Sequence, residues 1–255
     1  PDVDNDFSKR AYYASRVEAY RFSMPHGYAY DVNSSFVYSM TFPLPGSPIA
    51  EDHGILPKKG LYIADVDVFV PDMYLPPLPY RDTDNRLFFP TGAWSGVFTS
   101  IDIELALRVG CEIRGVRRVL TYEERDDLGD FARDVYAKRI EASDKFLYTA
   151  IKLLGNGAYG KFGEAEEKTE YLMHPVSTLC ERHYYTSKKG VVQCVEHKKP
   201  DCKACYAACS CLVQISPGIW RYDNRREIQH RHTQIGAFIT SIARRTLYEG
   251  QYSYA

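Results

Sequence analysis

The segment Leu61–Val70 alternates apolar and polar side chains, and this regularity constrains the fold more than any other feature of the sequence. Successive side chains of a strand point to opposite faces, so the alternation predicts a strand with one buried face. That face carries Ala64, Val66, Val68 and Val70. The segment 71–90 that follows is rich in proline and must be an irregular connection.

Capping residues predict a helix beyond a second candidate strand, Ala93–Phe98. Thr99 is a typical N-cap residue, and Asp102 lies three positions later, as the acidic partner of a capping box does. Gly110 is expected to end this helix, because glycine readily adopts the left-handed conformation common after a helix. A further short strand is predicted at Tyr28–Val32.

Residues 124 to 160 are predicted to be mostly helical, and a last helix is expected at Ala237–Tyr248 with its end at Gly250. Helical spacing places two apolar stripes on the first of these segments, and both are expected to face the core. The stripes are Leu128, Phe131 and Val135, and Leu147, Ile151, Leu154 and Ala158.

The composition excludes several classes of protein. Of the 255 residues, 45% are hydrophobic and 25% are charged, which excludes a disordered tail, a collagen-like chain and a coiled-coil rod. No apolar run reaches the ~18 residues needed to cross a bilayer, so no membrane partner is expected. Because no signal-peptide pattern is present, we expect an intracellular protein. Both ends, at Pro1 and Ala255, are interpreted as cuts through something longer.

The part of the chain from residue 180 onward is basic, although the net charge of the whole chain is −1. Such a segment suits a polyanion such as nucleic acid, and a solvated basic hairpin is the alternative. Seven cysteines without a secretory signal argue against a disulfide framework. Four clustered thiolates are possible Zn²⁺ ligands, with free thiols and no metal as the alternative. They are Cys202, Cys205, Cys209 and Cys211, and His183 and His197 compete with them.

A cation, an amide and an aromatic ring share one side of the helix predicted around residues 151–163. At about 100° per residue, Lys152, Asn156 and Tyr159 fall together, away from the apolar stripe. Such a line suits a nucleotide, because the ammonium can meet phosphates and the ring can abut a base. A frayed helix end with a solvated lysine is the alternative. Asp31, at the end of the predicted strand, has the position of a hard-metal ligand or of a simple turn residue.

Taken together, these segments resemble motifs of family B DNA polymerases. Residues 31–37, Asp-Val-Asn-Ser-Ser-Phe-Val, resemble motif A, D-x2-S-L-Y-P, and residues 152–160, Lys-Leu-Leu-Gly-Asn-Gly-Ala-Tyr-Gly, resemble motif B, K-x3-N-S-x-Y-G. The order of the motifs and the 121 residues from Asp31 to Lys152 also fit. Residues 12–15 resemble a degraded Y-x-G-G motif, and residues 240–244 resemble a T-x2-A/G-R motif. The long segment between motifs A and B indicates the protein-primed branch found in phages and linear plasmids.

The chain departs from the family pattern at several positions. Phe36 replaces the tyrosine of motif A, so it keeps the bulk that can exclude a ribose 2′-hydroxyl but lacks the phenol oxygen. The other replacements are Ser35 and Val37 in motif A, Gly157 in motif B, and Ala14 and Ser15 in Y-x-G-G.

The resemblance implies template-directed DNA polymerase activity: a deoxynucleotidyl group is transferred to a primer 3′-hydroxyl or to a priming-protein hydroxyl, supported by two Mg²⁺ ions. It implies that Asp31 and Lys152 are catalytic, and that Asp31 and the Val32 carbonyl hold Mg²⁺. The implied partners are primer–template DNA, a deoxynucleoside triphosphate and a terminal priming protein. The implied nucleotide-binding residues are Val32, Ser34, Ser35, Phe36, Lys152, Asn156 and Tyr159, and the implied DNA-binding residues are Tyr12, Gly160, Thr240 and Arg244.

The same resemblance implies an α+β fold: a polymerase palm sheet with two-helix fingers and insertions, truncated before the second catalytic carboxylate motif. In this interpretation the palm begins the chain and a helix of the palm ends it. The expected parts are residues 1–44 (palm with the metal-ligand motif), 45–121 (insertion), 122–163 (fingers helices), 164–235 (Cys-rich hairpin insertion) and 236–255 (palm helix).

Residues 80–84 spell Y-x-D-T-D, which nearly matches motif C, the source of the second metal-binding carboxylate. We reject this role, because the segment lies between motifs A and B and its neighbouring prolines do not suit paired strands. A solvated loop is predicted instead. Motif C is expected after Arg244, beyond the end of the chain, so these 255 residues alone are expected to have little polymerase activity.

Two other functions stay open from the sequence. One is a non-catalytic nucleic-acid-binding module, stabilised by zinc and built on the basic residues 180–255. The other is a metal-dependent nuclease, which has weaker support because Asp65 and Asp67 share one strand face without an identifiable partner.

Overall fold

The computed structural model describes residues 4–17, 26, 32–163, 167–173, 184–186, 192–194, 212–216, 219–225 and 232–252. The chain forms two compact units. The first comprises residues 1–164 and 231–255, and the second comprises residues 165–230. The strand predicted at Tyr28–Val32 lies outside the described residues, except for Val32.

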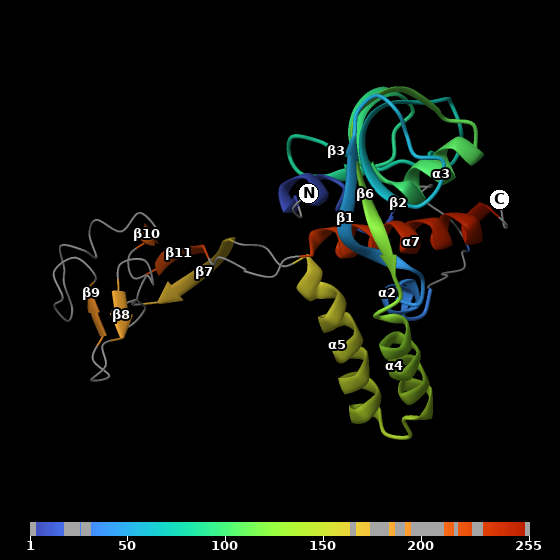
Figure 1. The fold of residues 1–255 in the computed structure, drawn as a ribbon. Helices are drawn as coiled ribbons and strands as arrows, with labels where there is room; N and C mark the ends of the chain where they lie inside the picture. Colours follow the sequence, from blue (N-terminus) through green and yellow to red (C-terminus); the bar gives the residue numbers. More distant parts are fainter. Residues whose placement is uncertain are drawn as a thin grey trace. The chain divides into compact units, whose positions relative to one another are not determined.

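A four-stranded antiparallel sheet forms the centre of the first unit (Figure 1). Its strands are β1 (Leu44–Asp52), β2 (Leu61–Val70), β5 (Gly92–Thr99) and β6 (Glu112–Arg125), in the order β1-β6-β2-β5. The two strands predicted in this region are confirmed as β2 and β5. The alternating apolar residues of β2, Ala64, Val66, Val68 and Val70, are all buried in one core cluster. The region predicted as an insertion between the motifs therefore supplies most of this sheet.

Strand β6 was not predicted, because charged side chains dominate its sequence. The structure shows how these charges are accommodated. Arg117 pairs with Asp65 of β2, and the Nε atom of Arg118 lies 2.8 Å from a carboxylate oxygen of Glu51 in β1. Cross-strand ion pairs thus occupy the positions where apolar side chains would reveal a strand. The buried hydrophobic residues of β6 are Val119, Leu120 and Tyr122.

The proline-rich connection is irregular, as predicted, apart from a small hairpin of β3 (Tyr80–Arg81) and β4 (Leu87–Phe88). The carboxylate of Asp82 stays within this hairpin loop. It accepts the backbone N–H groups of Asp84 and Arg86 at 3.0 and 2.8 Å. The hydrogen bond from the Arg86 backbone contributes most to lowering the pKa of Asp82. The predicted solvated loop is confirmed, and Asp82 acts as its internal cap.

The helices of the first unit are α1 (Asn5–Arg10), α2 (Ser35–Ser39), α3 (Ser100–Arg108), α4 (Gly129–Glu141), α5 (Lys145–Phe162) and α7 (Thr233–Tyr252). Helix α3 begins as predicted, because the side chain of Thr99 accepts the backbone N–H of Asp102. Gly110, just beyond this helix, has the expected left-handed backbone, with a φ of 94°.

Helix α7 is longer than predicted at both ends. Its start at Thr233 is held by the side chain of Asn5, whose Oδ1 atom lies 3.2 Å from the Thr233 hydroxyl. The predicted end at Gly250 is wrong, because the helix continues to Tyr252. A glycine inside a helix costs only about 1 kcal/mol relative to alanine, which does not by itself terminate a helix.

Helix α7 connects the sheet to the helix pair α4–α5, which lie side by side (Figure 1). Phe238, Ile239 and Ile242 of α7 are buried in one cluster that also contains residues of α2, α4 and the sheet. The stripe predicted on α4 belongs to this core, with Val135 buried and Leu128 and Phe131 packed against it. The elements that carry the predicted motifs are therefore fixed to one another by a single core.

The second predicted stripe, on α5, is only partly correct, because Ile151 packs against the core but the two leucines do not. The side chains of Leu147 and Leu154 are 48% and 58% exposed. The inner face of α5 instead passes through Gly155, where an added Cβ atom would lie 2.7 Å from a methyl carbon of Val37 and 3.3 Å from one of Val135. The missing side chain of Gly155 lets α5 approach α2 and α4 closely, and this rotates the leucines outward.

Replacing either of two glycines of α5 with alanine is expected to change stability in opposite directions. Gly155→Ala should lower the free energy of unfolding by about 1–3 kcal/mol, because its Cβ atom would overpack against stiff β-branched neighbours. Gly157→Ala is the matched control, since no atom lies within 4 Å of its Cβ position. It should raise the free energy of unfolding by up to about 1 kcal/mol through helix propensity. Urea unfolding of both variants checks this, and equal effects would contradict the packing of α5.

The second unit contains a three-stranded antiparallel sheet in the order β10-β11-β7 and a separate β8–β9 hairpin. The strands are β7 (Glu167–Met173), β8 (Tyr184–Thr186), β9 (Val192–Cys194), β10 (Leu212–Ser216) and β11 (Ile219–Arg225). The possible zinc ligands Cys202, Cys205, Cys209 and Cys211, and the competing His183 and His197, lie outside the described residues. Within the part of the chain that is described, no helix has the length and apolar character of a membrane span.

Candidate functional site

Three aromatic side chains from separate parts of the chain meet beside α5. The ring of Phe36, in α2, stacks on the ring of Tyr159, in α5, with centroids 4.2 Å apart and an interplanar angle of 17°. The hydroxyl of Tyr12, in the segment after α1, donates to the hydroxyl of Tyr159 over 2.7 Å. Three residues predicted as site residues from three different motifs therefore form one cluster.

Two glycines make room for the ring of Tyr12. A Cβ atom on Gly163, directly after α5, would lie 2.5 Å from the hydroxyl oxygen of Tyr12. A Cβ atom on Gly236, in α7, would lie 3.2 Å from the Cε2 atom of the same ring. The ring of Tyr12 thus occupies space that side chains at these positions would fill, between the end of α5 and the start of α7.

Lys152 and Asn156 continue the same side of α5 away from Tyr159. Spacings of four and three residues place the three side chains along one line of the helix. Lys152 and Asn156 are exposed, whereas Tyr159 is half-buried. Gly160, also exposed, has no atom within 4 Å of its Cβ position, so the surface there is open. A cation and an amide therefore face solvent next to the aromatic cluster.

Burial raises the pKa of Tyr159 well above that of a free tyrosine, and the hydrogen bond with Tyr12 adds to the rise. Tyr159 therefore keeps its proton at neutral pH.

The turn before α2 is held by Arg139, a residue of α4 that sequence reasoning missed. The guanidinium of Arg139 donates to the hydroxyl of Ser34 and lies over the ring of Tyr148, 4.5 Å from its centroid. Ser34 has a φ of 53°, which non-glycine residues adopt rarely. The carbonyl of Ser35 accepts the hydroxyl of Ser39 at 2.8 Å. A basic residue in the last turn of α4 was the only sequence signal for Arg139, and it was too common to single out.

Asp31, the predicted metal ligand, lies outside the described residues. Its neighbour Val32 is half-buried and lines an apolar groove of about 470 Å³ between α2 and α4. Among the residues that the structure describes, no three His, Cys, Asp or Glu side chains gather as a metal site requires. The described residues therefore do not complete a two-ion site on their own.

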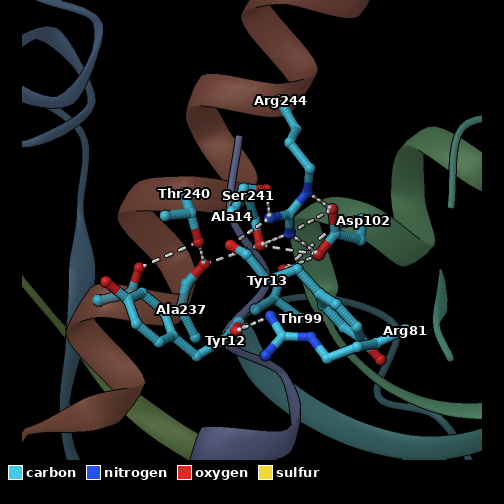
Figure 2. A network of polar contacts seen from close by, with 11 residues as sticks. Tyr12, Tyr13, Ala14, Arg81, Thr99, Asp102, Ala237, Thr240, Ser241 and Arg244 are labelled. Carbon is cyan, nitrogen blue, oxygen red and sulfur yellow. Dashed lines mark hydrogen bonds and ion pairs between the residues drawn. The ribbon is translucent and has the colours of Figure 1, made fainter. Parts of the chain in front are cut away.

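Thr240 and Arg244 are buried inside the first unit, and Figure 2 shows that their polar groups bind within the chain. The hydroxyl of Thr240 donates to carbonyl oxygens of its own helix, Gly236 and Ala237. Arg244 is 2% exposed and forms an ion pair with Asp102, with an N–O distance of 2.7 Å. The sequence prediction that both side chains contact DNA phosphates is therefore revised, because their donors bind within the chain.

Comparison with known proteins identifies what the chain is similar to. The family described as DNA polymerase type B, organellar and viral, matches residues 2–246. No match was found among curated proteins. The matched range includes the segments that resemble motif A, motif B, Y-x-G-G and T-x2-A/G-R.

Several solved structures of phi29 DNA polymerase share the fold. The ternary complex with primer–template DNA and incoming nucleotide is 17% identical, with a TM-score of 0.64, and the match covers 100% of this chain and 42% of the polymerase. The complex with single-stranded DNA is 16% identical, with a TM-score of 0.59, and the match covers 100% of this chain and 41% of the polymerase. The chain thus spans less than half the length of the polymerase it resembles, and the mixed helix–sheet fold is the same.

Proposed function

Since the chain belongs to the type B DNA polymerases of organelles and viruses, we propose that it forms the nucleotide-binding part of a protein-primed DNA polymerase. The reaction is deoxynucleotidyl transfer: a primer 3′-hydroxyl, or a hydroxyl of a priming protein, forms a bond to the α-phosphorus, and pyrophosphate leaves. The proposed setting is the replication of viral or plasmid DNA inside a cell.

The contact between Phe36 and Tyr159 carries this proposal. The two residues belong to the motif A and motif B segments, and their rings stack at 4.2 Å although more than 120 positions separate them. Motif resemblances that arose by chance would have no reason to meet in space. Their meeting supports a pocket in which both segments bind one nucleotide.

Each residue of the pocket has a chemical task in this proposal. The ammonium of Lys152 binds the triphosphate, and its charge matters most as negative charge develops on the leaving pyrophosphate. Phe36 blocks the position of a ribose 2′-hydroxyl and so favours deoxyribose. Asn156 and Tyr159 position the incoming nucleotide, and Ser34 and Ser35 shape the turn that holds Phe36, with Arg139 fixing Ser34.

Primer–template DNA is the proposed partner on the neighbouring surface. Tyr12 belongs to the aromatic cluster and Gly160 follows Tyr159 in α5, and the open backbone at Gly160 suits a close approach of DNA. Arg244 supports this surface from inside the unit by holding the segment that carries Tyr12, and Thr240 binds carbonyl groups of the same helix.

Mg²⁺ is the proposed cofactor, with Asp31 as its carboxylate ligand and the Val32 carbonyl as a second oxygen. When bound, the ions would lower the pKa of the attacking hydroxyl and neutralise charge on the phosphates. Among the described residues, no three His, Cys, Asp or Glu side chains gather as a metal site, so the proposal assigns only these two ligands.

Magnesium-dependent nucleotide binding tests the proposal. We expect Asp31→Ala to abolish the gain in deoxynucleotide affinity that Mg²⁺ gives, because the variant lacks the carboxylate that holds the ion. Asp72→Ala, which removes an exposed carboxylate after β2, is the control and should keep the full gain. Equilibrium titration with and without Mg²⁺ provides the measurement.

The same titration separates the zinc-stabilised module from the polymerase. A zinc chelator should leave the Mg²⁺-dependent affinity unchanged if the chain acts as proposed. If chelation abolished DNA binding while Asp31→Ala changed nothing, the nucleic-acid-binding module would be favoured and the polymerase proposal would fail.

A further inference from the structure

The buried ion pair of Arg244 and Asp102 satisfies all of its polar atoms inside the protein (Figure 2). The Nε and Nη2 groups of Arg244 donate to the carboxylate of Asp102 at 2.7–3.2 Å, and Nη2 also donates to the hydroxyl of Ser241. The Asp102 carboxylate is further bound by the hydroxyls of Ser241 and Thr99, at 2.7 and 3.1 Å. The pair thus joins the start of α3 to the middle of α7.

The remaining donor group of Arg244 holds an irregular segment of backbone. Nη1 donates to the carbonyl oxygens of Tyr13 and Ala14, at 2.9 and 3.1 Å. Residues 12–17 belong to no helix or strand, so no ladder of backbone hydrogen bonds fixes them. Buried carbonyl groups need donors, and here a side chain of α7 supplies them. Arg244 therefore fixes the middle of this segment, while Arg16 anchors its later part by donating to the Pro76 carbonyl at 2.7 Å.

The segment that Arg244 holds is the one that carries Tyr12. The ring of Tyr13 is fixed on the other side by stacking on Phe98, with centroids 5.9 Å apart. Tyr12, one residue earlier, donates to Tyr159, and Tyr159 stacks on Phe36. An uninterrupted series of contacts thus runs from Asp102 to the ring proposed to face the sugar.

We propose that Asp102 is a positioning residue for nucleotide recognition. Through Arg244, it keeps Tyr12, Tyr159 and Phe36 in contact with one another. The inference rests on the proposed function, because the sugar-facing role of Phe36 belongs to it. Asp102 touches neither substrate nor metal in this proposal. It orients the guanidinium of Arg244, and the guanidinium sets the backbone beside Tyr12.

Stability alone does not explain this arrangement. A buried ion pair is often no more stabilising than well-packed apolar residues of similar volume, because desolvation of the charges is costly. Apolar residues, however, could not donate to the Tyr13 and Ala14 carbonyls. The pair gives the segment of residues 12–17 a defined position. This segment begins with Tyr12, which lies beside the proposed nucleotide pocket.

The preference for dATP over ATP measures this positioning. Both affinities are determined by titration with Mg²⁺ and a primer–template whose next template base is thymine. Asp102→Asn is expected to lower the ratio of dATP affinity to ATP affinity by about tenfold. When Tyr12 is less well fixed, the ring of Phe36 can move aside and admit a ribose 2′-hydroxyl. A variant that is merely less folded loses both affinities equally, so the ratio reports positioning rather than stability.

Ser241→Ala provides a milder second variant, because it removes one hydroxyl that touches both Asp102 and Arg244. It should lower the preference by about threefold. Thr246→Val is its control: it removes a hydroxyl of the same helix whose one hydrogen bond among the described residues is to the Ile242 carbonyl, and the preference should not change.

Each outcome decides the inference. A wild-type preference retained in both Asp102→Asn and Ser241→Ala would overturn it, and if Asp102→Asn does not fold, Ser241→Ala decides in the same way. A wild-type chain that binds dATP and ATP equally well would contradict the role of Phe36 and overturn the inference. If the wild-type chain showed no Mg²⁺-dependent nucleotide binding, the proposed function itself would fail, and the inference with it.

Discussion

Replacing Arg244 with methionine is expected to lower the free energy of unfolding by about 3–5 kcal/mol. The substitution leaves the carboxylate of Asp102 buried without its counter-charge and deprives the Tyr13 and Ala14 carbonyls of their donor. Urea unfolding of the wild type and of the Arg244→Met variant measures this loss of stability.

Two further variants make this prediction specific. Arg108→Met breaks an exposed ion pair with Glu249 and should cost only about 0–1 kcal/mol. Combining Arg244→Met with Asp102→Leu should recover part of the loss, because no charge is then left unpaired. A cost below about 1 kcal/mol for Arg244→Met would show that the pair is not desolvated as the structure has it.

Lys152→Ala is expected to weaken Mg²⁺-dependent dATP binding by about 10- to 100-fold. A charge-assisted hydrogen bond to phosphate contributes about 1.5–3 kcal/mol, and the exposed ammonium of Lys152 has no other task in the proposed pocket. Titration against dATP provides the measurement. Because the side chain is exposed, stability should change little, so the loss reports binding.

Lys59→Ala, in the connection between β1 and β2, is the matched control, since it removes another exposed ammonium. Its dATP affinity should equal that of the wild type. Equal losses in the two variants would mean that net charge alone attracts the nucleotide, and the assignment of Lys152 to the triphosphate would then be wrong.

The sequence predicted those parts of the fold that depend on local pattern. The alternation in Leu61–Val70 and the capping pair of Thr99 and Asp102 specify a strand and a helix start without reference to distant residues, and both were confirmed. The line of Lys152, Asn156 and Tyr159 likewise follows from helical periodicity alone. The meeting of Phe36 with Tyr159 was implied only by the family resemblance.

The errors concern features that tertiary contacts decide. The exposure of Leu147 and Leu154 on α5 follows from the close approach at Gly155, and the sequence alone does not show which residues will pack against a glycine. The burial of Arg244 depends on Asp102, a partner 142 positions away whose sequence signal was that of a helix cap. Strand β6 was not predicted because charged residues such as Arg117 and Arg118, which pair with carboxylates of the neighbouring strands, hide its pattern.

The central claim, that Asp31 and Lys152 bind the same triphosphate, is tested most directly by a double-mutant cycle on Mg²⁺-dependent dATP binding. We predict that the losses from Asp31→Ala and Lys152→Ala are coupled by at least about 1 kcal/mol, because both groups act on one ligand. Losses that add to within about 0.5 kcal/mol, or an Asp31→Ala chain that binds dATP like the wild type, would contradict it.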